Sequence, residues 1–247
     1  MPVARSRGRS RGAKQEPAKE RAGTGYDEAM GQARAAGGWA WPLFLLSASA
    51  WGQQYTADRA GSLPPEIAPG IAQALVKTGF LISKQGMAYC EIWLRASIPS
   101  GPSRTARGEA APNVTLPDIP QGTLLGLIRF DGTGLDRRGQ TIQPGVYTLR
   151  YGIMPMNDTH QGAAPQRDFL LLAPAAEDRD PNLAPNFDTL LAMSRKASHS
   201  AHPAVLSFWK AASDSPGFSQ QGDSDWVLEA KIGDIPIDII VAGVASS

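Results

Sequence analysis

The 247-residue sequence has a single cysteine, Cys90, so it cannot form a disulfide bond within the chain. The apolar, strand-like surroundings of Cys90 favour a small buried side chain over a reactive thiol. No apolar run approaches the ~20 residues that a membrane-spanning helix needs. The sequence also lacks the Gly-x-Ser-x-Gly, Walker A, Cys-x-x-Cys, His-Glu-x-x-His and dinucleotide-binding glycine motifs. These absences argue against a disulfide scaffold and a transmembrane anchor, and they leave no strong catalytic or cofactor motif.

One short segment, Trp39–Ala50 (WAWPLFLLSASA), has the composition of a secretory signal peptide. Its apolar core, Trp39–Leu46, is followed by small residues that end in Ala48-Ser49-Ala50. We therefore predict a signal peptide at residues 38–52, cleavage near Ala50, and a periplasmic or extracellular mature protein. Because the chain cannot form a disulfide, a bacterial envelope or growth medium is favoured over a eukaryotic secretory pathway.

The predicted signal begins unusually late, because residues 1–37 precede it. This segment is basic and poor in apolar residues, which predicts a disordered tail. One interpretation is an arm that binds nucleic acid or a membrane surface. The other, which we favour, is that translation starts at Met30, so that Arg34 supplies the positive flank of an ordinary signal peptide.

The charge balance of the chain changes once the leader is removed. Of the 24 basic and 23 acidic side chains, eight and four lie in residues 1–52, which leaves 16 and 19 and a net charge of −3. A mildly acidic domain without a basic stripe argues against nucleic acid as the partner of the mature protein. Residues 53–247 are long enough for one domain with a sizeable core.

Residues 53–247 show short strand patterns separated by turns rich in glycine and proline. Two helices are expected: Ser62–Gly79, with Pro69 in its first turn, and Asn186–Ala197, with Asn186 as its N-cap. The strands are expected at Phe80–Ser83, Met87–Ser97, Val114–Ile119, Thr123–Phe130, Thr141–Ile153, Gln166–Ala173, Ala204–Lys210, Trp226–Ile232 and Ile235–Val241. The predicted fold class is mainly β: an antiparallel β-sandwich with two short helices.

The segment Met154–His160 (MPMNDTH) concentrates possible metal ligands directly after a strand. Methionine and histidine together suit copper, and three histidines suit zinc. The candidate ligands of a copper or zinc site are therefore Met154, Met156, Asp158, His160, His199 and His202. The alternative is structural: the methionines fill the core, and the Asn-Asp pair belongs to an ordinary turn.

Carboxylates offer two further candidate sites. Asp131 and Asp136 flank glycines as in a calcium loop, although the full EF-hand spacing is absent and a β-turn explains the pattern equally well. Glu91 and Glu229 lie on predicted strands and are candidates for the paired carboxylates of a glycoside hydrolase. Their alternative interpretation is as solvent-facing residues on a half-exposed sheet.

Aromatic side chains on the predicted strands suggest how a partner could bind. Several of them on one outer face would form a platform for a glycan or another protein, although most are expected in the core. These residues are Tyr89, Trp93, Tyr147, Tyr151, Trp209 and Trp226.

The segment Gly145–Pro174 (GVYTLRYGIMPMNDTHQGAAPQRDFLLLAP) resembles uncharacterised exported proteins of soil bacteria. The resemblance implies export but no named activity, and it transfers no catalytic residue. Taken together, the sequence favours a non-enzymatic exported binding or accessory module. A metal-binding protein that uses the His160 loop and a hydrolase with dispersed carboxylates are the alternatives.

Overall fold

The computed structural model describes residues 54–99, 112–154 and 166–244, which belong to one compact unit that spans Ser49–Ser247. The predicted tail at residues 1–37, the predicted signal at residues 38–52 and most of the loop Pro99–Pro112 lie outside the described residues. No helix in the described ranges is both long and apolar enough to cross a membrane.

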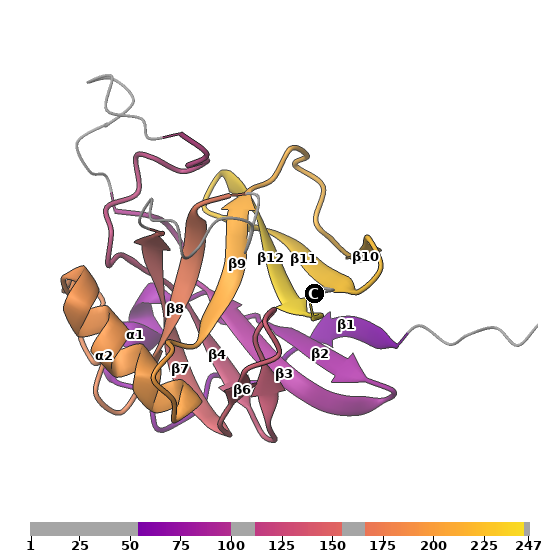
Figure 1. The fold of residues 1–247 in the computed structure, drawn as a ribbon, viewed down its shortest axis with the longest axis horizontal. Helices are drawn as coiled ribbons and strands as arrows, with labels where there is room; N and C mark the ends of the chain where they lie inside the picture. The colour runs from indigo at the N-terminus through magenta and orange to yellow at the C-terminus, as the bar shows by residue number, and fades with distance from the viewer. Residues whose placement is uncertain (1–53, 100–111, 155–165, 245–247) are drawn as a thin grey trace, which may run out of the picture. The chain divides into compact units, whose positions relative to one another are not determined.

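Ten strands of the described chain form one sheet, in the order β1-β2-β3-β4-β7-β8-β9-β12-β11-β10, and every neighbouring pair is antiparallel (Figure 1). Their bounds are β1 Tyr55–Arg59, β2 Phe80–Lys84, β3 Met87–Leu94, β4 Leu124–Phe130, β7 Gly145–Ile153, β8 Asp168–Pro174, β9 Val205–Lys210, β10 Gly217–Gln221, β11 Asp225–Ile232 and β12 Ile235–Ala242. A separate small pair consists of β5 Gly134–Leu135 and β6 Thr141–Ile142. The prediction of a mainly antiparallel β fold is confirmed.

The large sheet curls until its two ends nearly meet. The ring of Tyr55 on β1 lies 5.6 Å from the ring of Trp226 on β11, and Phe218 on β10 stacks on the same indole at 5.5 Å. The inner face is lined by side chains that are almost completely buried, such as Ile92, Leu149 and others on β9, β11 and β12. Burial of this continuous apolar surface is the main force that keeps the two ends of the sheet near each other.

The outer face is covered over β4 and β8, so these strands are buried on both sides. Helix α2, Phe187–Ser198, lies against the sheet beside β8 (Figure 1). Its Leu190 packs against Phe169 and Leu171 of β8. The short helix α1, Pro69–Ala74, packs against a cluster that includes residues of β3 and β4. Two-sided cover explains why both strands consist of almost uninterrupted apolar residues.

The structure confirms several features that were predicted from the sequence. The side-chain Oδ1 of Asn186 accepts a hydrogen bond from the backbone N–H of Thr189 at 2.9 Å, so the predicted N-cap starts α2. Cys90 is buried, as expected, and burial raises the pKa of its thiol well above the ordinary value. The hairpin between β11 and β12 turns at Gly233, which has a φ of 60° that glycine adopts without strain.

One predicted helix is shorter than expected and one predicted strand was wrong, because distant contacts override local propensity. The expected helix Ser62–Gly79 is limited to α1, since Leu75 leaves the helix in an extended conformation and pairs with Arg95 after β3. The expected strand Val114–Ile119 forms turns instead. Strands β1 and β10 were missed because their short polar sequences show little alternation.

Candidate functional site

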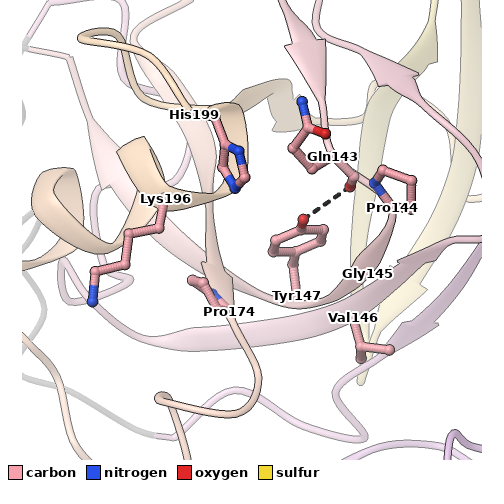
Figure 2. A pocket seen from close by; sticks show the side chains of 8 residues that line it. All are labelled: Gln143, Pro144, Gly145, Val146, Tyr147, Pro174, Lys196 and His199. Atoms are coloured by element: carbon pink, nitrogen blue, oxygen red, sulfur yellow. Dashed lines mark hydrogen bonds between the residues drawn. The ribbon is translucent and has the colours of Figure 1, made fainter.

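An open hollow of about 600 Å³ lies between the C-terminal end of α2 and the beginning of β7 (Figure 2). This hollow is a candidate ligand site, because its volume falls in the range of small-molecule pockets and its walls combine apolar surfaces with polar groups. The lining residues are Gln143, Pro144, Gly145, Val146, Tyr147, Pro174, Lys196 and His199.

One wall is the turn that leads from β6 into β7. The hydroxyl of Tyr147 donates a hydrogen bond to the carbonyl of Gln143 at 2.8 Å, and burial raises the pKa of this phenol. The absence of a side chain at Gly145 lets the Tyr147 ring pack against the turn, because a Cβ at Gly145 would lie 3.0 Å from the Tyr147 hydroxyl oxygen. Gly145 also has a φ of 154°, which residues with a side chain rarely adopt. The backbone N–H of Gln143 donates to the carbonyl of Ala197, at 3.0 Å, and so fixes this wall to α2.

The opposite wall is the last turn of α2. His199 is the C-cap residue and has a left-handed φ of 51°, a conformation that reverses the chain direction. Its imidazole is directed into the same space as the side chains of Gln143 and Tyr147, whereas the ammonium end of Lys196 points away from these side chains (Figure 2). The Lys196 Nζ forms an ion pair with the Glu177 Oε2 at 2.6 Å.

The structure separates the predicted copper or zinc ligands. His160, Met156 and Asp158 lie outside the described residues. Met154 is partly buried against the Phe169 cluster, as expected of a core methionine, and His202 is exposed. Only His199 lines the hollow, and no group of three or more His, Cys, Asp or Glu in the described ranges could hold a metal ion. A site that includes His160 stays a prediction.

The two aspartates of the predicted calcium loop have arginine partners. Asp136 is completely buried and accepts hydrogen bonds from the backbone N–H groups of Arg138 and Gln140, both at 2.9 Å, and from the Arg138 guanidinium. Asp131 is exposed and pairs with Arg129 at 3.1 Å. Asp136 is thus the first residue of a turn that ends at Gly139 and follows the predicted calcium loop. A calcium site at Asp131 and Asp136 stays a prediction.

The candidate hydrolase carboxylates lie on different strands. Glu91 on β3 is largely buried and pairs with Arg129 at 2.5 Å, so its expected position on an exposed face was wrong. Glu229 on β11 stands directly opposite Asp238 on β12 and accepts a hydrogen bond from Ser219 at 3.0 Å. Sequence reasoning missed Asp238, although a lone carboxylate within the apolar run IPIDIIVA was a usable signal.

Asp238 carries an electrostatic cost. It is 8 % exposed, and its Oδ1 has no hydrogen-bond partner among the described residues. Burial raises the pKa of Asp238, the negative charge of Glu229 raises it further, and a hydrogen bond from Trp209 partly opposes the shift. A raised pKa means that the folded state holds this proton more tightly than the unfolded state does, so stability is lost as the pH rises through the folded-state pKa.

Asp238→Asn is therefore expected to stabilise the protein at pH 7. Removal of a like-charge pair across two strands is worth roughly 0.2–1 kcal/mol, which corresponds to a melting temperature higher by up to about 4 °C. The difference should shrink as the pH falls toward the ordinary carboxyl pKa of 3.8. Thermal unfolding between pH 3.5 and 8 measures it. The exposed Asp214→Asn is the control, and an Asp238→Asn protein less stable than wild type at pH 7 would contradict the account.

The aromatic residues do not share one exposed face. Trp93, Tyr151 and Trp226 are buried. Tyr89 is partly buried and its hydroxyl accepts a hydrogen bond from the Leu135 N–H at 3.0 Å. Tyr147 remains as the aromatic residue that lines the hollow. Its companions Gln143 and Lys196 were missed, because they come from segments that meet only in the folded chain.

Comparisons of this chain with protein-family models, with curated proteins and with solved structures find no match.

Proposed function

We propose that this chain is an exported, non-enzymatic binding module that holds one sugar unit of a glycan in the hollow between α2 and β7. The observation that carries the proposal is the convergence of hydrogen-bonding side chains from two distant segments, 143–147 and 196–199, around a space of about 600 Å³. Sites for small ligands typically combine apolar walls with a few fixed polar groups.

The chemistry of the walls fits a polyhydroxylated ring. The surfaces of Pro144, Pro174 and the Tyr147 ring offer apolar contact to the C–H face of a sugar. The side-chain amide of Gln143 both donates and accepts hydrogen bonds, and the imidazole of His199 does the same in its neutral form. A sugar hydroxyl also donates and accepts, so these groups are complementary to it.

We extend the proposal to the architecture. In a β-sandwich, β1–β4 would face β9, β11 and β12 across the shared apolar interior, and the contact of Tyr55 with Trp226 supports that arrangement. An experimental structure with continuous hydrogen bonding between β1 and β10 would contradict it.

The proposed location is the periplasm or the cell exterior. The compact unit begins at Ser49 and its first strand at Tyr55, so cleavage after Ala50 would leave every described strand whole. We therefore expect that expression of the full reading frame in a bacterium yields an exported protein, and that its mass, measured by mass spectrometry, is that of a chain starting at Trp51. Recovery of an intact cytoplasmic chain that begins at residue 1 would contradict export.

The same processed protein is used to measure binding. Titration calorimetry against neutral and acidic monosaccharides and disaccharides is expected to give at least one ligand with a Kd in the micromolar to millimolar range. His199→Gly should weaken that binding about tenfold, the effect of one hydrogen bond of about 1.4 kcal/mol. Glycine suits the left-handed φ of this C-cap, so the variant should fold normally.

His202→Ala is the matched control, because His202 is exposed and does not line the hollow. Its affinity should equal that of the wild type. If no sugar binds, or if His202→Ala weakens binding as much as His199→Gly does, the proposed function is wrong.

A further inference from the structure

The hollow has one lysine, Lys196, in its lining. Among the described residues, no aspartate or glutamate lines it. The Lys196 Nζ forms an ion pair with the Glu177 Oε2, at a distance of 2.6 Å. The hollow therefore presents the Lys196 ammonium, and Glu177 supplies its counter-charge.

Glu177 is placed at the rim by a tight turn. Its backbone N–H donates to the carbonyl of Pro174 at 3.0 Å, and Pro174 itself lines the hollow. The side chains of Lys196 and Glu177 are 57 % and 45 % exposed. An ion pair with this much contact to water contributes little to stability, so another carboxylate can take the place of Glu177 at low cost.

The end of α2 opposes an anion, but weakly. A helix C-terminus carries roughly half a negative charge. Here the carbonyls of Ala197, Ser194 and Arg195 already accept hydrogen bonds from Gln143, Ala204 and Ser198. The last turn also holds two full positive charges, on Arg195 and Lys196, which outweigh the dipole.

We infer that the hollow selects an acidic sugar, a uronic acid unit whose carboxylate replaces that of Glu177 on the Lys196 ammonium. The inference rests on the proposed sugar-binding function and adds the charge of the ligand. Glu177 then acts as an internal competitor: it occupies Lys196 in the free protein, so it opposes the binding of acidic sugars and has no effect on neutral ones. The ring of the sugar keeps the contacts with Tyr147 and the two prolines.

The test compares galacturonic acid with galactose, which differ at the carboxylate, on the processed protein at low ionic strength. Galacturonic acid is expected to bind about tenfold more tightly than galactose. Lys196→Met should remove this preference, so that the variant binds galacturonic acid and galactose with equal affinity. Glu177→Gln should strengthen the binding of galacturonic acid several-fold, because the competitor is neutral, with no effect on galactose.

Lys231→Met is the control for a general charge effect, since Lys231 pairs with Asp214 elsewhere on the surface. It should leave both affinities unchanged. If the two sugars bind equally, or if Lys196→Met keeps the preference, the acidic-ligand inference fails and the sugar-binding proposal stands. If neither these two sugars nor any other sugar binds, both fail.

Discussion

Replacing Arg150 by methionine is expected to lower the free energy of unfolding by about 3–5 kcal/mol, the cost of breaking a buried ion pair by removing one partner. Arg150 is completely buried and holds Asp178 through two charged hydrogen bonds, Nε to Oδ2 at 2.7 Å and Nη2 to Oδ1 at 2.6 Å. The same guanidinium donates to the backbone carbonyls of Gly122, Asp180 and Leu183. One side chain on β7 thus fixes the segment that follows β8.

The variant would lose more than the ion pair. Asp178 would remain as a buried carboxylate with the hydroxyl of Thr148, and three backbone carbonyls would lose a charged donor. Arg95 donates to the carbonyl of Pro181 in the same segment at 3.0 Å, so part of the attachment would survive. For a domain of this size the melting temperature should fall by about 6–20 °C, measured by circular dichroism.

Two further variants make this result specific. Lys231→Met breaks the exposed pair with Asp214, at 3.6 Å, and should cost less than about 1 kcal/mol. Combining Arg150→Met with Asp178→Leu should recover part of the loss, because the uncompensated charge is then removed. Equal effects of Arg150→Met and Lys231→Met would contradict a stabilising role for the buried pair.

The elements that were predicted correctly are those whose sequence signals, such as a capping residue or a tight turn, lie within the element itself. The second helix was expected at Asn186–Ala197 and is found at Phe187–Ser198, since a capping side chain starts it and a left-handed residue ends it. The hairpin at Gly233 depends on a turn and two alternating strands that are adjacent in sequence. In both cases the deciding interactions lie within a few residues.

The elements that sequence mispredicted depend on contacts between distant segments. Strand β10, with the sequence GFSQQ, is ordered by its pairing with β11, not by its own composition. The candidate hollow has the same origin. His199 was predicted as a metal ligand, but its neighbours Gln143 and Tyr147 lie in another segment, and contacts such as the hydrogen bond from Gln143 to Ala197 bring the two walls together.

Replacing Asp168 by asparagine is expected to cost about 1–3 kcal/mol, although the two side chains have almost the same shape. Asp168 is 1 % exposed, and both of its oxygens accept hydrogen bonds. Oδ1 accepts from the N–H of Leu116 at 3.1 Å and the hydroxyl of Tyr151 at 2.6 Å, and Oδ2 accepts from the N–H and the hydroxyl of Thr115 at 2.7 and 3.0 Å. This carboxylate therefore holds the segment expected as a strand at Val114–Ile119.

An asparagine has one acceptor oxygen, and its amide group would face two donors in either orientation. One of these two donors is a hydroxyl, of Tyr151 or Thr115, which can rotate and accept from the amide, but the other is a backbone N–H that cannot. One backbone N–H would therefore lose its acceptor, and such a loss costs about 1–3 kcal/mol. Hydrogen exchange locates the effect: the amides of Thr115 and Leu116 should exchange much faster, while those of β11 and β12 stay protected. Exposed Asp223→Asn is the control. Unchanged protection at residues 115 and 116 would mean that backbone turns, and not Asp168, hold this segment in place.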